Sequence, residues 1–400
     1  MITRRQILKS AAAGALVSAA PTMAFAKAET DARLVLVILR GAADGLAIAA
    51  PYGDGHYSKA RGELALSRPG TTGGLLKLDG LFGLHPSLEN VYAEYQQGQA
   101  TIVHAIASPY RDRSHFDGQD VLENGSSATG LLRDGWLNRA LTPLGGSLGN
   151  EPAIAMAQNT PLVLRGDNSV TSWAPSQLPD ADDSTIARLQ RLYADDEFFA
   201  TRLTQALKSQ EIAAGEMDMD GGRRRGNDSE QTVAMAQATA KFLTAADGPR
   251  IAVLEAGGWD THANQGNDTG ALANRLAGLD AGLAALRDGL DAQWSNTVVA
   301  VVTEFGRTVH VNGTRGTDHG TATAALLLGG AVDGGKVIAD WPGLAQKDLY
   351  EGRDLQPTAD IRGLFKGLLA EHLELNSAFL ERNVFPASAS AAIMRDLVKS

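Results

Sequence analysis

The sequence predicts an α/β fold with a mainly parallel central sheet and helices on both faces. Five continuous apolar runs have the length and content of strands that are buried on both faces of a sheet. Helical patterns lie between the later runs, and alternation of strands with helices is typical of a parallel sheet. In chain order, the expected strands cover residues 34–39, 100–107, 251–254, 297–302 and 324–328.

The clearest helical pattern is a leucine stripe with alternating spacings of four and three residues, which gives a helix one apolar face. The stripe consists of Leu272, Leu276, Leu279, Leu283, Leu286 and Leu290. Helices are also expected over 187–214, 231–246 and 357–375, the last with Thr358 as its N-cap. Polar, Gly-rich sequence predicts a loop over 215–230, and turn residues are concentrated in 51–83.

Residues 1–26 have the features of a twin-arginine signal peptide, and we expect residues 27–400 to form a single domain. Arg4-Arg5 precedes a weakly apolar segment, and Ala24-Phe25-Ala26 supplies a small-x-small cleavage pattern. A membrane-anchoring helix is the alternative, but the apolar segment is short and rich in Ala, Gly and Ser. The sequence therefore predicts export by the twin-arginine machinery to the periplasm or the cell exterior. No stable membrane anchor is expected after cleavage.

Composition excludes several classes of function. A net charge of −10 argues against nucleic acid as the main partner, because binding phosphates needs basic patches. The chain has no cysteine, which excludes disulfides, thiolate metal sites, iron–sulfur clusters and a cysteine nucleophile. A Walker loop, a dinucleotide-binding glycine motif and a G-x-S-x-G elbow are also absent. Any metal must be held by nitrogen and oxygen atoms.

Five polar strings are expected at one edge of the sheet, where parallel α/β folds bind their ligands. Four follow predicted strands directly and the fifth precedes the last strand: 40–45, 108–117, 257–262, 303–308 and 316–320. Asp260 and His262 are the strongest ligand pair, because their spacing in a loop presents both side chains to one ion. The candidate metal ligands are Asp44, Asp260, His262, Glu304, Asp318 and His319. These donors are compatible with Zn, Mn, Ca or Mg.

Other roles remain open for several of these candidates. Asp44 is either a ligand or the closing residue of a Gly-rich turn, and Glu304 is either a ligand or a carboxylate behind the ligands. Ser114 is a candidate nucleophile or an N-cap. His115 is suited to binding the metal, holding an anionic substrate group or anchoring its loop. Arg307 either neutralises a bound phosphate or sulfate or forms a surface salt bridge.

The chain resembles the DUF1501 family of exported bacterial proteins over essentially its whole mature length. The resemblance rests on 40–46, 114–117, 257–262, 303–308, 316–320, 352–355 and 358–362. The family looks like a remote branch of the alkaline phosphatase and sulfatase superfamily, whose members cleave or transfer phosphate and sulfate esters. That resemblance implies an alkaline phosphatase-like fold with a metal site at the sheet edge.

Carried onto this sequence, the resemblance implies one good metal site, formed by Asp260, His262 and His319. A second site, with Asp44 and Glu304, is weakened, and Ser114 is the best match to the nucleophile. We therefore expect an exported metal-dependent hydrolase that acts on a phosphate or sulfate ester, with a surface polymer as one candidate substrate. The alternative is a non-catalytic periplasmic protein that binds metal or glycan. An oxidoreductase accessory is a weaker alternative, since cysteine and nucleotide motifs are absent.

Overall fold

The computed structural model describes residues 31–145, 151–175, 183–213 and 228–399. Within these ranges, a nine-stranded mixed sheet has the order β11-β5-β10-β9-β1-β8-β6-β7, and β12 also pairs with β5. The strands are β1 Arg33–Leu39, β5 Ala100–Ala107, β6 Ala153–Ala155, β7 Thr171–Ser172, β8 Ile251–Ala256, β9 Thr297–Thr303, β10 Thr323–Leu328, β11 Lys336–Ile338 and β12 Ala359–Asp360. Every pairing in this sheet is parallel except those of β10 with β5 and β9. The predicted α/β class with a mainly parallel sheet is confirmed.

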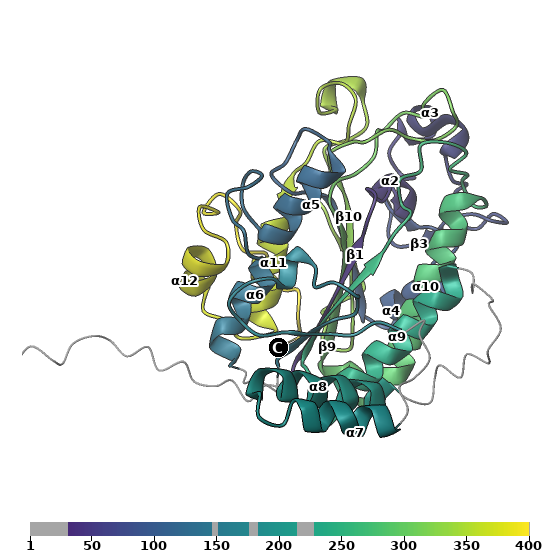
Figure 1. Cartoon of the computed structure of the whole chain (residues 1–400). Helices are drawn as coiled ribbons and strands as arrows, with labels where there is room; N and C mark the ends of the chain where they lie inside the picture. Colours follow the sequence, from purple (N-terminus) through teal and green to yellow (C-terminus); the bar gives the residue numbers. More distant parts are fainter. Residues whose placement is uncertain (1–30, 146–150, 176–182, 214–227, 400) are drawn as a thin grey trace, which may run out of the picture.

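Helices cover both faces of this sheet (Figure 1). The α-helices are α2 Gly45–Ile48, α3 Tyr57–Arg61, α4 Glu89–Gln96, α5 His115–Asn124, α6 Trp136–Leu141, α7 Asp183–Leu192, α8 Glu197–Ala213, α9 Asp228–Thr244, α10 Ala271–Leu290, α11 Ile361–Glu371 and α12 Ser377–Phe379. Short 3-10 segments lie at Gly62–Leu64, Thr142–Leu144, Leu162–Leu164, Asp291–Asn296 and Gln346–Asp348, and Leu380–Val384 is a π-helical turn.

Alternate residues of β1 enter two different cores, because successive side chains of a strand point to opposite faces. Val35 and Val37 pack with the leucine stripe of α10, together with α9 and α4. Leu36 and Ile38 pack on the other face with α6 and α11. The central strand is therefore apolar from Leu34 to Leu39, which explains why this part of its sequence is a continuous run.

The turn-rich segment 51–83 contains the α3 helix and strand β3, Leu76–Lys77. This strand and β2, Ala49–Ala50, both pair antiparallel with β4, Gly83–Leu84. The segment thus forms a small second sheet beside the main one. In the described part of the chain, no helix is both long and apolar enough to cross a bilayer.

Two helix predictions were wrong in detail. The predicted helix 187–214 is two helices, α7 and α8. The first ends at Leu192, and Asp196 caps the start of the second, because its side chain accepts the Phe199 N–H at 3.1 Å. Thr358 is not an N-cap, since its N–H donates to Ala105 O and β12 follows it along β5. Helix α11 instead begins after Asp360, whose carboxylate accepts the Arg362 N–H at 2.9 Å. The predicted signal peptide and most of the predicted loop 215–230 lie outside the described residues.

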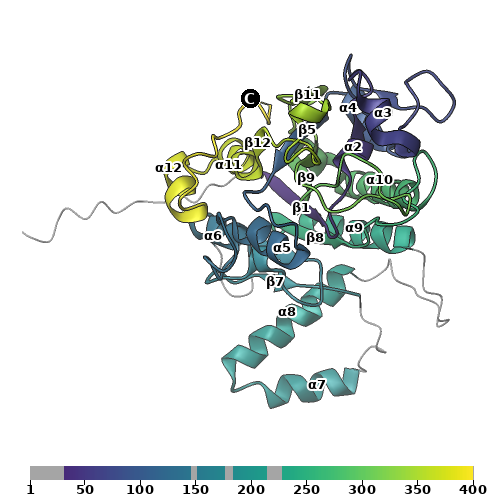
Figure 2. The ribbon, with the colours of Figure 1, turned by 90° about the horizontal axis from the view of Figure 1, so that it is seen from above.

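The direction of β10 brings all five polar strings to one edge. Strands β1, β5, β8 and β9 run parallel, so their carboxyl ends share that edge. Strand β10 runs the opposite way, so its first residue, Thr323, lies at the same edge, and 316–320 lead into it. Helices α7 and α8 form an arm that projects from the body of the molecule (Figure 2) and lies near the opposite edge (Figure 1).

Candidate metal centre

Three histidines and one aspartate converge at this edge of the sheet. Nε2 of His262 lies 3.0 Å from Asp260 Oδ1, and Nε2 of His319 lies 3.1 Å from the same oxygen. The two Nε2 atoms are 3.0 Å apart. Nε2 of His115 lies 3.4 Å from Asp260 Oδ2. We call these four residues the His/Asp cluster.

Three members of the cluster could together hold a metal ion. Among the described residues, His115, Asp260 and His319 each offer a ligand atom, and these atoms lie within 4.8 Å of one another. Nε2 of His115 is buried and has no hydrogen-bond partner. A buried nitrogen without a partner, aimed at a carboxylate and other imidazoles, is compatible with a bound cation.

Glu304 fixes the His115 ring rather than joining the cluster. Its Oε1 atom accepts His115 Nδ1–H at 2.9 Å, Gly41 N–H at 2.9 Å and Gln119 Nε2–H at 3.1 Å. Burial alone would raise the pKa of Glu304, but the hydrogen bonds from His115 and the other donors lower it to about 2. The carboxylate is therefore ionised and holds Nδ1–H of His115, which leaves Nε2 to face Asp260.

The other two rings are fixed in the same way. Nδ1 of His262 lies 3.2 Å from Asp318 Oδ1, so the ring nitrogen donates to a carboxylate. Nδ1 of His319 donates to the Arg113 carbonyl oxygen at 2.8 Å. In each ring the proton is placed on Nδ1 because Nδ1 faces a hydrogen-bond acceptor. In all three histidines, Nδ1–H is thus engaged away from the cluster and Nε2 faces into it.

Asp260 is paired with Arg307. The buried Arg307 Nη1 donates to Asp260 Oδ1 at 2.5 Å, Nε donates to Thr317 Oγ1 at 3.0 Å, and Nη2 donates to Thr317 O. Burial raises the pKa of Asp260, but the hydrogen bond and charge of Arg307 outweigh it, so the pKa is lowered. The surface salt bridge that the sequence left open for Arg307 is wrong, since the side chain is enclosed.

Asp44 has its own set of partners, separate from those of Glu304 and of the cluster. Its buried carboxylate forms an ion pair with Arg61, accepts Gln265 Nε2–H at 2.7 Å and accepts the Leu46 N–H as N-cap of α2. Asp44 and Glu304 thus bind different partners, and the second metal site stays a prediction. Gln265 also accepts hydrogen bonds from Thr261 and Thr317, which links the Asp44 pair to the loop that carries Asp260.

Ser114 lies between two residues that contact the cluster. It is the N-cap residue of α5, but its side chain makes no capping hydrogen bond. The preceding carbonyl, Arg113 O, accepts from His319, and the following residue is His115. The structure thus places Ser114 at the N-terminal end of a helix beside the cluster. The alternative role of its side chain as an N-cap is not observed.

Gly41 allows the loops to approach closely enough for the cluster to form. Its φ is +119°, and a Cβ atom there would lie 2.7 Å from the backbone nitrogen of Asp260. Its own N–H donates to Glu304. A glycine is therefore required where the loop after β1 meets the loop after β8.

Some contributing residues gave no signal in the sequence. Gln119 lies one helical turn after His115 and shares Glu304 with it, so helical spacing would have found it once α5 was recognised. Phe305 packs its ring against His115, with centroids 5.1 Å apart, and lies 5.3 Å from the His319 ring. The backbone carbonyl of Arg113 accepts a hydrogen bond from the His319 ring, and no sequence motif reveals this contact.

The other five histidines take no part in the cluster. Four contact backbone carbonyl oxygens and the fifth is largely exposed: His85 with Asn267, His104 with Ala49, His310 with Ala60, His372 with Arg33, and His56 beside Asp54. Burial lowers the pKa of His104 to about 4. Burial also lowers the pKa of His85 and His372, which favours the neutral form of these three rings.

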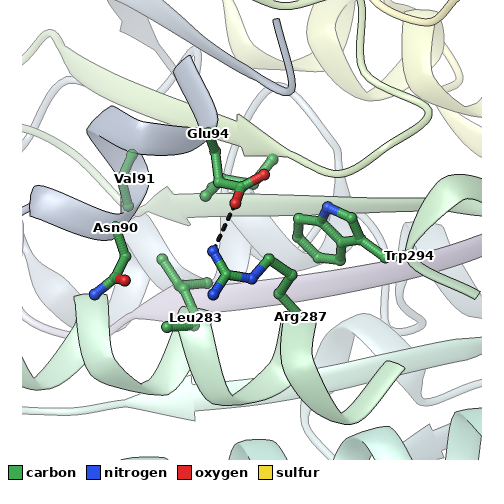
Figure 3. Close-up of a pocket in the computed structure, with 8 residues that line it drawn as sticks. Asn90, Val91, Glu94, Leu283, Arg287 and Trp294 are labelled. Atoms are coloured by element: carbon green, nitrogen blue, oxygen red, sulfur yellow. Dashed lines mark hydrogen bonds and ion pairs between the residues drawn. The ribbon is translucent and has the colours of Figure 1, made fainter. Parts of the chain in front are cut away.

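A small cavity lies beside α4 and α10 (Figure 3). Because Leu328 lines it and β10 begins at the edge that carries the cluster, the cavity lies at the opposite end of the sheet. It is lined by residues of α4 and α10 together with Trp294 and Leu328, the last residue of β10. Its volume of about 10 Å³ has room for roughly one water molecule. Arg287 donates to Glu94 at 2.7 Å beside it. This cavity is too small to bind an ester substrate.

Known structures with similar folds share little sequence with this chain. A structure of Ps i-CgsB in complex with k-i-k-neocarrahexaose is 12% identical, covers 90% of this chain and 77% of its own, and has a TM-score of 0.40. The phosphonate monoester hydrolase of Agrobacterium radiobacter is 12% identical over 84% of this chain and 73% of its own, with a TM-score of 0.36. A variant of TAB5 alkaline phosphatase is 12% identical over 74% of this chain and 90% of its own, with a TM-score of 0.32.

No curated protein matches the sequence. Residues 31–384 match the sequence profile of a family described as Protein of unknown function (DUF1501). The match covers nearly all of the residues that follow the predicted signal peptide, including every residue of the His/Asp cluster. The chain therefore belongs to the DUF1501 family.

Proposed function

We propose that this protein is an exported metal-dependent hydrolase of phosphate or sulfate esters. Its single divalent ion would be held by His115, Asp260, His262 and His319. The observation that carries the proposal is the direction of the three imidazole rings. Each ring donates its Nδ1–H outward, so three Nε2 lone pairs and a carboxylate meet in one place. Such a set of acceptors favours a cation or a shared proton among them.

The donor set also indicates which ion fits. Three imidazoles and one carboxylate suit Zn²⁺ better than Ca²⁺ or Mg²⁺, which prefer oxygen donors. Glu304 and Asp318, which the sequence analysis listed as candidate ligands, do not bind the ion directly in this assignment. They are the carboxylates that hold the rings of His115 and His262. His115, which the sequence also offered as an anion holder, becomes a ligand.

A divalent ion bound there would supply Lewis-acid polarisation of an ester oxygen. Residues of the chain would supply the nucleophile, stabilise negative charge and orient the ligands. Ser114 is the candidate nucleophile, because it precedes His115 and its hydroxyl is not used to cap α5. The first turn of α5 presents backbone N–H groups and the positive end of the helix dipole beside that hydroxyl, which favours negative charge there. Arg307 keeps Asp260 ionised and oriented.

A non-catalytic periplasmic protein that binds metal or glycan is the rival function. One observation favours it: Asp44 is paired with Arg61 and Gln265, and these contacts compete with its use as a ligand of the second metal site that the resemblance implies. The superfamily's two-metal mechanism would then be incomplete. Binding without turnover is what this rival predicts.

Turnover of simple esters separates the two functions. We expect the zinc-loaded protein to hydrolyse 4-nitrophenyl phosphate or 4-nitrophenyl sulfate, and chelation to abolish the reaction. Asp260→Asn should lower kcat/KM by at least about 100-fold, because the electrostatic stabilisation of the transition state depends on the ion. The control is Asp268→Asn, which changes an exposed carboxylate in the same loop and should leave the rate unchanged. Full metal content with no turnover of any ester would instead support the rival.

A further inference from the structure

An anionic ester needs a cation beside the cluster, and Arg307 is not available to provide it. The Arg307 side chain is 0% exposed, and its donors are used by Asp260 and Thr317. A substrate cannot reach it without breaking those contacts. The sequence-based role of Arg307 as the anion holder therefore has no support from its surroundings, and another side chain must take that role.

Two further arginines near the cluster are already matched by carboxylates. Arg40 follows β1, is 19% exposed, and forms ion pairs with Glu123 at 2.6 Å and with Glu255. Arg113 is 20% exposed and forms ion pairs with Glu351 at 2.6 Å and with Asp354 at 2.8 Å. Binding an anion at either side chain would mean displacing two carboxylates.

Arg353 differs from these residues in exposure and in partners. Its side chain is 40% exposed, and Nη2 donates to the backbone oxygen of His319 at 2.7 Å. Nη1 lies 3.5 Å from Asp354 Oδ1, an atom that is buried and accepts no hydrogen bond. The other oxygen of Asp354 accepts from Arg113 and Thr321. The charge of Asp354 thus attracts the guanidinium without occupying its donors.

The backbone holds Arg353 next to His319. Residues Thr308 and Asp354 form one antiparallel bridge, and Arg307 and His319 form another. Arg353 O also accepts the Val309 N–H at 3.2 Å. The segment 352–355, a motif of the family resemblance that the cluster itself does not use, is therefore the neighbour of the segment that carries His319.

From this placement we infer that Arg353 holds the anionic group of the substrate beside the His/Asp cluster. The inference rests on the proposed function and names the substrate-binding residue of the same site. The planar guanidinium presents paired N–H donors, which match two oxygens of a phosphate or sulfate group. Asp354 and His319 O fix the guanidinium in advance, so little side-chain freedom is lost when the anion binds.

The test is the binding of inorganic phosphate to zinc-loaded protein, measured by calorimetry. Arg353→Ala should weaken phosphate binding by at least about tenfold, because a charge-assisted hydrogen bond is lost. Arg353→Lys should recover part of the affinity, since it keeps the charge but not the paired donors. The control is Arg315→Ala, an exposed arginine on the loop before His319 that contacts Asn264. It should bind phosphate like the unaltered protein.

Zinc affinity, measured on the same proteins, separates anion binding from a positioning role. We expect Arg353→Ala to bind zinc as tightly as the unaltered protein, because none of the four ligands is removed. Phosphate affinity that is unchanged in Arg353→Ala overturns the inference and leaves the proposed function intact. Loss of zinc in that variant also overturns it, since Arg353 would then act only by holding His319. Zinc-loaded unaltered protein that binds no phosphate or sulfate contradicts both the inference and the proposed function.

Discussion

At the scale of single residues, the cluster depends on groups that orient its imidazole rings. Glu304 is the most enclosed of these, with four donors directed at its carboxylate: His115, Gly41, Gln119 and Thr303. These donors stabilise the ionised form of the carboxylate and so lower its pKa. An amide in its place would turn one N–H group toward another donor, and His115 would lose its charged acceptor.

Glu304→Gln should therefore lower zinc affinity by about 10- to 100-fold, the range seen when a group that orients a metal-binding histidine is removed. Competition with a chelator of known affinity measures this change. Glu255→Gln is the matched control, because Glu255 lies at the same edge but pairs with Arg40. The melting temperature of the metal-free variant shows whether the fold persists. Unchanged zinc affinity in a folded Glu304→Gln variant would contradict the role given to Glu304.

Sequence alone placed Asp260, His262 and His319 at one edge, because strand ends and Gly-rich strings mark that edge. It did not predict the partners of Asp44. Arg61 and Gln265 lie 17 and 221 residues away along the chain, and no spacing rule links a glutamine that distant to a carboxylate. The enclosure of Arg307 also depends on Thr317, which the chain brings in through a separate loop.

At the scale of elements, short loops between strands and helices decide whether the cluster can form. The loop after β1 and the loop after β8 touch at Gly41 and Asp260. Local sequence does not always decide where a helix begins. Thr358 and Asp360 are both suitable N-caps, and the pairing of β12 with β5 decides between them. Asp196 splits a stretch whose apolar pattern is helical throughout.

Gly41→Ala should destabilise the fold by about 2 kcal/mol or more, because the added Cβ meets the backbone of Asp260 and the positive φ disfavours alanine. Zinc affinity should fall with it, since Asp260 must move. The matched control is Gly257→Ala, where a Cβ meets nothing within 4 Å. That change should alter stability by no more than about 0.5 kcal/mol. Equal urea midpoints for the two variants would show that the two loops do not need this close approach.

At the scale of the whole molecule, one sheet carries two cores and one site. Apolar runs predicted the strands but not their directions, because a buried parallel strand and a buried antiparallel strand have the same composition. The antiparallel direction of β10 explains why 316–320 contribute to the edge before their strand and not after it. The sheet order, which places β10 between β5 and β9, has no signature in the sequence.

The buried histidines predict that the fold loses stability in mild acid. Burial lowers the pKa of His104 to about 4, below its ordinary value of 6.5, so the unfolded chain binds this proton first as the pH falls. Stability from this residue is complete above pH 6.5 and declines as the pH falls toward 4. The loss at pH 5 is about 2 kcal/mol. Burial also lowers the pKa of His85 and His372, which adds to the same trend.

Urea unfolding of the metal-free protein at pH 7.5 and pH 5.0 measures this effect, with chelator present so that metal release does not contribute. His104→Gln removes the titrating ring and should reduce the acid-induced loss by about 2 kcal/mol, although it is less stable at pH 7.5. Groups that titrate in both proteins cancel in the comparison. An identical loss in the two proteins would show that the His104 ring does not supply it.

The proposed function requires that His115, Asp260, His262 and His319 together hold one divalent ion. Elemental analysis of the protein purified from its native export compartment tests it most directly, alongside Asp260→Ala, His319→Ala and the control Asp268→Asn. We expect close to one ion per chain in the unaltered protein and in the control, and strongly reduced metal in the two cluster variants. Folded, unaltered protein without metal, or cluster variants that keep their metal, would contradict it.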